Sequence, residues 1–320
     1  MALITVNSTE SPIIYETELT RNIKFAVFVA LEPPALICNF ILIYYLISDR
    51  TLRHALHYHA ILALLIITLL VNLIEIPRGA DYLRIGIVLP QTNIYCLTWQ
   101  WFDYSLYGTI NIYVLWISFE RYLIIFHGDF YRTIMRRWLF HYAPLLIIVV
   151  YTFIFYAMAV FVYPCELQLD FTQPLCGVPC YTNFASISMY DLIAHTVSAI
   201  VLTILLDMVL IIRVFIRQHI DRYVQIVQWR KHRKMMIQLL IISSLYLICQ
   251  IPYVVVVFVQ LSGKLPDSIV YVQIVYFNYL FWLSAQLLPL VCIVCTDEIT
   301  NKLKDILTQK WRRNLVVIPL

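Results

Sequence analysis

The chain alternates long apolar stretches with short polar segments. A helix needs about 20 apolar residues to cross a bilayer, and windows of this kind fall at 25–47, 58–77, 98–126, 138–163, 187–212, 235–261 and 269–295. Seven windows predict an all-α membrane protein, a seven-transmembrane helix bundle with its termini on opposite sides. A short C-terminal amphipathic helix on the membrane surface is predicted after residue 296, with an apolar face formed by Ile299, Leu303, Ile306 and Leu307.

This pattern divides the chain into an N-terminal segment (1–24), a membrane domain (25–295) and a tail (296–320). Basic residues indicate the orientation, because Lys and Arg gather on the cytoplasmic side. With the N-terminus outside, 18 of the 23 Lys and Arg residues fall on the inner side. The sequon Asn7-Ser8-Thr9 agrees, since glycosylation occurs only on the outer or luminal side. We therefore predict an extracellular N-terminus and a cytoplasmic C-terminus.

Composition excludes a soluble protein. The chain is 62% hydrophobic and 13% charged, with a mean hydropathy of +0.79. Soluble domains have about 45–50% apolar and about 25% charged residues. The lipid bilayer is therefore the first predicted partner.

The third stretch, from Cys96 to His127, is predicted to organise the bundle. Asp103 and Arg121 are 18 residues apart, about five helical turns, so they share one face. That face carries Asp103, Tyr107, Asn111, Val114, Ser118 and Arg121. The opposite faces carry Phe102, Leu106, Ile110, Ile117 and Leu123. Within a bilayer such a polar stripe must face a protein interior or a watered cavity.

The eight cysteines form two groups. Four lie inside predicted spans and are expected to pack as small apolar residues: Cys38, Cys249, Cys292 and Cys295. The other four lie on the predicted outer side, where disulfides persist: Cys96, Cys165, Cys176 and Cys180. Four cysteines allow three connectivities, and metal binding by Cys176 and Cys180 is the alternative.

Several motifs occur together. Cys96 stands 25 residues before Arg121, which lies in Glu120-Arg121-Tyr122 at the inner end of the third span. Asn39, Cys249-Gln250-Ile251-Pro252 and Pro289 stand in spans one, six and seven. With seven spans and an outside N-terminus, the chain resembles rhodopsin-like (class A) G-protein-coupled receptors over nearly its whole length. Within that family it resembles divergent orphan receptors grouped with peptide receptors, such as those for FMRFamide-like peptides.

The resemblance implies a plasma-membrane receptor that transmits binding of an extracellular ligand to a heterotrimeric G protein, with no enzymatic activity, cofactor, metal or nucleic-acid partner. It also implies a disulfide between Cys96 and Cys176, with Cys180 and Cys165 as alternatives, and glycosylation at Asn7. The chain departs from the family in several spans. Span two has no Asp, Gln250 replaces the Trp of span six, and Leu288-Pro289-Leu290-Val291-Cys292 replaces Asn-Pro-x-x-Tyr. These departures put sodium regulation and the usual Trp and Tyr switches in question.

A cation site is expected around Asp103. In the family, an Asp at the matching position is the counter-ion for amines and for basic groups of some peptides, and Trp99, Tyr107 and Tyr279 would surround such a cation. Further candidates to face the same cavity are Asp191, His195, Gln250, Tyr253 and Trp282. The alternative is that Asp103 only bonds neighbouring helices, and that the aromatic residues form an interfacial belt.

A switch is expected at the inner end. Arg121 needs a carboxylate partner, which Glu120 or, from span five, Asp207 could supply. The remaining candidates for coupling to the G protein are Tyr122, Pro252 and Pro289. The sixth span begins with the basic run 230–234 and offers no acid to Arg121, so a loose resting state is expected. The alternative is a charged helix end at the membrane interface.

Two other classes of protein fit part of the pattern. A membrane metalloenzyme could use the inner-side histidines His54, His57, His59, His127 and His141. These are more simply interfacial residues, since only one cluster is present. A transporter or channel would show repeated halves with matching broken spans, which the sequence lacks.

Overall fold

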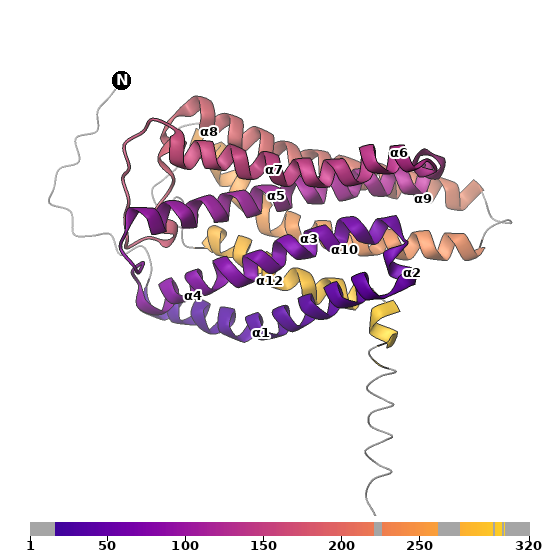
Figure 1. The fold of residues 1–320 in the computed structure, drawn as a ribbon, viewed down its shortest axis with the longest axis horizontal. Coiled ribbons are helices and arrows are strands. Elements are labelled where there is room, and N and C mark those ends of the chain that lie inside the picture. Colours follow the sequence, from indigo (N-terminus) through magenta and orange to yellow (C-terminus); the bar gives the residue numbers. More distant parts are fainter. Residues whose placement is uncertain (1–16, 221–225, 262–275, 297, 303, 305–320) are drawn as a thin grey trace, which may run out of the picture.

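Long helices run side by side through the molecule in the computed structural model (Figure 1). The structure describes residues 17–220, 226–261, 276–296, 298–302 and 304. The sequon at Asn7, the first part of the seventh predicted span and most of the tail lie outside these residues.

Six described helices are long and apolar enough to cross a membrane, and a shorter apolar helix, Tyr279–Cys295, accompanies them. In chain order the spans are α1 (Glu18–Ser48); α3 (Leu56–Leu70) with the π-helical turn η1 (Val71–Glu75) and α4 (Ile76–Ile85); α5 (Asn93–Phe126); α6 (Ile134–Arg137) with η3 (Trp138–Tyr142), α7 (Ala143–Ala157) and η4 (Met158–Val162); α8 (Ala185–Asp191) with η7 (Leu192–Val197) and α9 (Ser198–Ile220); α10 (Ile226–Leu261); and α12 (Asn278–Cys295). The connections contain the short turns α2 (Arg50–Arg53), η2 (Gly128–Tyr131), η5 (Pro174–Cys176) and η6 (Cys180–Asn183). The all-helical prediction is confirmed.

Several spans are longer than their apolar windows. α1 begins at Glu18 rather than at residue 25, because the Thr17 hydroxyl caps it by accepting from the Thr20 amide at 3.3 Å. The second span continues past Pro77 to Ile85, where Gly86 in the left-handed conformation (φ 83°) ends it. The preceding π turn widens the helix just before the proline.

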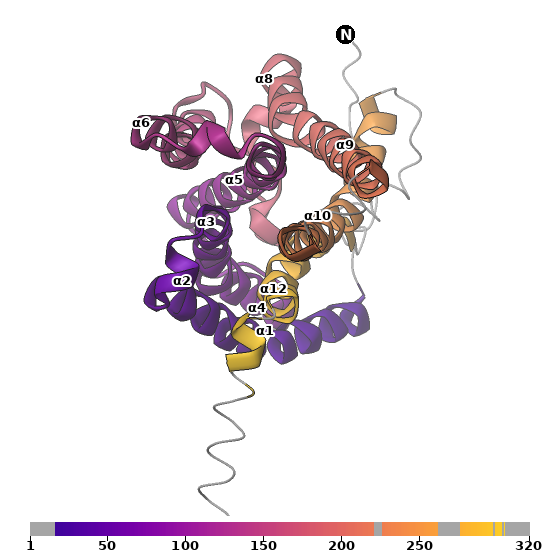
Figure 2. The same cartoon turned by 90° about the vertical axis from the view of Figure 1, so that its right-hand side faces the viewer.

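α5 has helices on several sides. It packs against α3, α7 and α9, while α1 packs against α12, α3 and α4, and α10 packs against α12. Figure 2 looks along the helices and shows α5 and α10 inside the outline formed by the other spans. The bundle has two ends. The disulfide end contains the start of α5 with Cys96, and the Arg121 end contains the last turns of α5 with Arg121.

The polar stripe of α5 faces the protein interior, as predicted. Tyr107, Asn111, Val114, Ser118 and Arg121 are all buried, and Asp103 is partly exposed. The opposite apolar face is not turned to lipid, however: Leu106, Ile110 and Ile117 are 0–1% exposed. Helical periodicity alone shows one polar face and cannot show how many neighbours enclose the helix.

Polar side chains join α5 to α7 at three levels. The Thr109 and Thr152 hydroxyls lie 2.7 Å apart. The Tyr113 hydroxyl donates to the Leu145 carbonyl at 2.7 Å, and the Trp101 indole donates to the Phe153 carbonyl at 3.1 Å. Such bonds hold helices together in lipid, where the hydrophobic effect does not.

The beginning of the tail packs back onto the bundle at the Arg121 end. Residues 298–302 are helical and turn away from the bundle axis (Figure 1). Ile299 is buried, the Gln238 amide donates to the Thr296 hydroxyl at 3.0 Å, and Lys302 pairs with Asp49. These contacts fix the direction in which the tail leaves the last span.

Gly108 allows α5 and α7 to approach closely, and we predict that Gly108→Val destabilises the protein. A Cβ at this position would lie 2.8 Å from the Tyr156 ring, which is buried and donates a hydrogen bond to Asp191 at 2.6 Å. Overpacking of this kind costs about 1–3 kcal/mol. The thermal unfolding temperature of detergent-purified protein should fall. Gly128→Ala, with no neighbour within 4 Å of the added Cβ, is the control, and equal melting of Gly108→Val and wild type would contradict the close approach.

Candidate functional site

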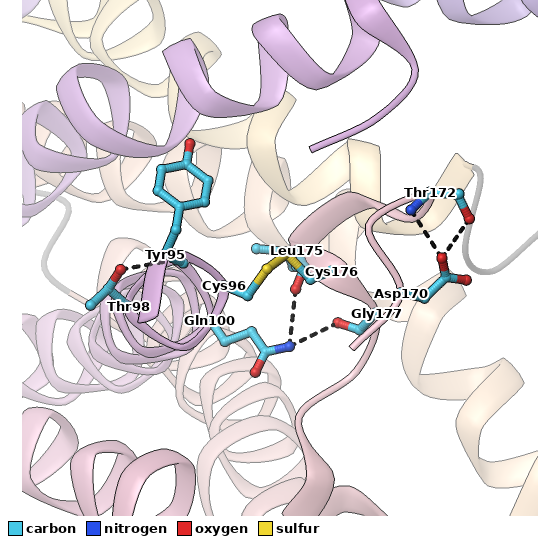
Figure 3. Close-up of a disulfide and its surroundings, with 9 residues drawn as sticks. All are labelled: Tyr95, Cys96, Thr98, Gln100, Asp170, Thr172, Leu175, Cys176 and Gly177. Atoms are coloured by element: carbon cyan, nitrogen blue, oxygen red, sulfur yellow. Dashed lines mark hydrogen bonds between the residues drawn. A yellow bond between two sulfur atoms is a disulfide. The ribbon is translucent and has the colours of Figure 1, made fainter. Parts of the chain in front are cut away.

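The loop between the fourth and fifth spans is covalently joined to α5 at the disulfide end. A disulfide joins Cys96 to Cys176, with the Cα atoms 5.7 Å apart (Figure 3). One turn below Cys96, the Gln100 amide donates to the carbonyls of Leu175 and Gly177 at 2.9 and 3.3 Å. This is the pairing that the sequence analysis favours.

The same loop is internally braced. Cys165 and Cys180 form a second disulfide, and the Asp170 carboxylate accepts from the amide and hydroxyl of Thr172 at 2.9 and 2.6 Å. Leu175 and Cys176 have left-handed backbones, φ 60° and 56°. Such conformations cost non-glycine residues roughly 1–3 kcal/mol each. The covalent link and the Gln100 bonds hold this strained turn over the bundle.

Asp103 lies below this loop on α5. Its carboxylate accepts a hydrogen bond from the Trp282 indole of α12 at 3.0 Å. Trp282 is buried and packs closely against Gly79 of α4, where an added Cβ would lie 3.2 Å from the indole ring. Asp103 itself remains partly exposed, so the acid is anchored by one neighbour and still accessible.

Two further acids of the spans lie near Asp103 or its neighbour Tyr107. Glu75 of η1 is fully buried near the Trp99 indole; among the described residues neither of its carboxylate oxygens has a hydrogen-bond partner, and its ion pair with Arg78 is long, at 3.8 Å. On α1, one oxygen of Glu32 accepts from the Gln286 amide at 2.8 Å, and the other is buried without a partner among the described residues. The sequence analysis did not single out either residue. An acid inside an apolar window is the signal that would have identified both.

The buried Tyr107 hydroxyl interacts electrostatically with all three acids, Asp103, Glu75 and Glu32. Among the described residues it has no hydrogen-bond partner. We call Glu32, Glu75, Asp103 and Tyr107 the acidic cluster. Three carboxyl groups with few donors between them form a site that a cation can satisfy.

The predicted aromatic cage is formed only in part. Trp99 and Tyr107 are buried on α5 near the cluster. Tyr279 lies elsewhere: its ring stacks on Phe28 at 4.6 Å, and its hydroxyl donates to the Lys24 carbonyl at 3.2 Å. It therefore joins α12 to α1.

Asp191 and His195 form hydrogen bonds that connect the fifth span to the fourth. The Asp191 carboxylate accepts from Tyr156 at 2.6 Å, from Tyr181 at 2.9 Å and from His195 Nδ1 at 2.7 Å. His195 Nε2 lies 2.9 Å from the Tyr151 hydroxyl. Burial raises the pKa of Tyr181, a loop residue, well above its usual range. The structure thus places this pair in a hydrogen-bonded network separate from Asp103.

The sixth span contributes two of the predicted residues. The Gln250 amide donates to Asn111 of α5, and the Tyr253 ring packs edge-on against Phe281 at 5.2 Å. Phe281 also contacts Tyr107 at 5.9 Å. Tyr253 is therefore linked to the acidic cluster through one aromatic ring, whereas Gln250 joins helices.

At the Arg121 end, the expected pairing of Arg121 with Glu120 is wrong. Arg121 Nη2 donates to the His57 carbonyl at 3.0 Å, and no described carboxylate forms an ion pair with it. Glu120 instead bonds His141 of η3. The sequence analysis treated His141 as an interfacial histidine, yet it is fully buried.

The second proposed partner, Asp207, is also engaged elsewhere. Its carboxylate accepts from the Ser243 hydroxyl at 2.5 Å, which joins α9 to α10. Tyr122 packs under the Arg213 guanidinium at 5.2 Å. Pro252 and Pro289 lie inside α10 and α12, where each removes a backbone donor and favours a bend.

Comparison with known proteins identifies the family. The family model for seven-transmembrane receptors of the rhodopsin family matches residues 38–302, most of the chain. No curated protein matches the chain. The match carries no indication of the ligand and gives no support to a placement among FMRFamide-like peptide receptors. The chain therefore belongs to the rhodopsin family of seven-transmembrane receptors, the class A G-protein-coupled receptors, and is a multi-pass, non-enzymatic membrane protein that signals through a G protein.

Proposed function

We propose that this receptor recognises a cationic extracellular ligand, an amine or a basic peptide, through the acidic cluster. The observation that carries the proposal is the partial satisfaction of three carboxyl groups among the described residues: Asp103 has one donor, Glu32 has one, and Glu75 has a long ion pair and a nearby Trp99 indole. Burying a carboxylate without a partner is unfavourable. An ammonium or guanidinium group would supply the missing donors.

The proposal requires the disulfide end to face outward. Its support is the distribution of basic residues, of which 18 of 23 fall towards the Arg121 end or in the tail. We accordingly propose a plasma-membrane location with an extracellular segment 1–24, a cytoplasmic tail 296–320 and a glycan at Asn7. Acids on the proposed outer surface, among them Asp81 and Glu166, would steer cations toward the bundle.

Glu75 favours this reading over a purely structural role for Asp103. A helix-bonding acid needs only the Trp282 indole. Glu75 lies near enough to Asp103 to interact with it electrostatically, and two carboxylates close together repel unless a proton or cation lies between them. The helix-bonding alternative leaves Glu75 unexplained.

A ligand screen tests the proposal directly. Cells expressing the receptor would be exposed to amines and basic amidated peptides, each with a neutral or acidic analogue, and coupling would be recorded with sensors for each G-protein class. Activation is expected only from cationic members of the panel. Activation by neutral or anionic compounds alone would overturn the proposal.

Asp103→Asn is expected to weaken binding of the activating cation by about 1–3 kcal/mol, the scale of a charge-assisted hydrogen bond. The asparagine keeps an acceptor for the Trp282 indole, so folding should be preserved. Radioligand or competition binding measures the change. Asp129→Asn, an exposed acid in η2 at the Arg121 end, is the control, and equal affinities for both variants would remove Asp103 from the site.

Glu75→Gln is expected to weaken binding of the cation without lowering the stability of the receptor. The buried carboxylate lacks hydrogen bonds, so removing its charge should leave the melting temperature of the ligand-free receptor unchanged or raise it. Affinity for the cation should fall by about 1–3 kcal/mol. A lower melting temperature with unchanged affinity would indicate that the Glu75–Arg78 pair is structural.

Arg121→Ala is expected to abolish ligand-dependent coupling while ligand binding and surface expression persist. The side chain is buried at the Arg121 end, and within the described part of the chain its hydrogen bond is to the His57 carbonyl. G-protein activation and ligand binding would be measured in the same cells. Arg84→Ala, at the disulfide end, is the control, and undiminished coupling in Arg121→Ala would refute the switch assignment.

A further inference from the structure

A buried acid–histidine contact lies beside Arg121. Glu120 of α5 is 1% exposed and His141 of η3 is fully buried. One Glu120 carboxylate oxygen bonds His141 Nδ1. The sequence neighbour of Glu120 is the arginine that would ordinarily compete for this carboxylate.

His59 and Tyr142 lie next to His141. His59 Nε2 lies 2.6 Å from the Arg53 carbonyl, and because a carbonyl only accepts, this nitrogen carries a proton. His59 Nδ1 lies 3.2 Å from His141 Nε2 and 3.2 Å from the Tyr142 hydroxyl.

His141 bonds the Glu120 carboxyl group through Nδ1 and contacts His59 through Nε2. Both ring nitrogens of His141 are therefore engaged, and the Glu120 carboxyl group is bonded to η3 rather than to Arg121.

Among the described residues, Arg121 has no ion pair. Its Nη2 donates to the His57 carbonyl at 3.0 Å, and its Nη1 is buried without a hydrogen-bond partner in the described part of the chain. A carbonyl holds a guanidinium less strongly than a carboxylate does, because it carries no full negative charge to attract the cation.

We propose that His141 is a positioning residue for G-protein coupling, which binds the Glu120 carboxyl group in place of Arg121 and so keeps the arginine free of an ion pair. This inference concerns the Arg121 end and does not depend on the ligand site proposed above. The competing account is purely structural: His141 joins α5 to η3, and Glu120 and Arg121 would not interact even without it.

A double-mutant cycle distinguishes the two accounts without a ligand or a G protein. Glu120→Gln, Arg121→Gln and the double variant would be purified, and their melting temperatures measured, in the wild-type and His141→Phe backgrounds. Such cycles isolate the energetic coupling between two residues. We expect the two shifts to add in the wild-type background and to deviate from additivity in His141→Phe, where Glu120 turns to Arg121.

The control background is His54→Phe, which changes an exposed histidine at the same end and should leave the shifts additive. Strong coupling of Glu120 with Arg121 in the wild-type background would overturn the proposal, as would additivity that persists in His141→Phe. If His141→Phe does not fold, the wild-type cycle is combined with His141→Asn, whose amide can replace the Nδ1 donor but cannot carry a proton's charge. Partial coupling of Glu120 with Arg121 is expected there, and its absence would refute the inference.

Discussion

A charged group within a bilayer must find its partner inside the protein, and this requirement fixes how α5 is placed. Charges near the middle of a membrane are costly unless they are paired or hydrated. Asp103 and Arg121 share one face of α5, and that face is turned to neighbouring helices. The remaining helices supply an indole to the acid and a backbone carbonyl to the arginine. The packing of the bundle therefore has to satisfy both the acid and the arginine.

The sequence predicts this much because helical periodicity and span length are properties of a single segment. The buried stripe of α5, the all-helical fold and the family follow from such local signals. The bonds of Glu120 to His141, of Asp191 to Tyr156 and of Asp207 to Ser243 do not, because each joins two different spans. Which side chains meet depends on helix rotation and depth, and these are set by packing between spans.

The residues that the sequence analysis missed also show that spatial neighbours cannot be predicted from one segment. Glu32 and Glu75 lie in apolar windows and were recognisable as unusual, but only the fold brings them near Asp103. Tyr279 fits an aromatic cage by composition, yet its ring stacks on Phe28 of α1. Residue type therefore identifies candidates, and the register between helices selects among them.

The twice-bridged loop over the disulfide end has a consequence for biosynthesis. One bridge joins it to α5, and the other links two of its own residues that are 15 positions apart. These covalent links, together with the Gln100 hydrogen bonds, determine its path. On the proposed orientation, this loop takes its final conformation only after its thiols are oxidised in an oxidising compartment. Chains made under reducing conditions would span the membrane, but the loop at the disulfide end would not be fixed to α5.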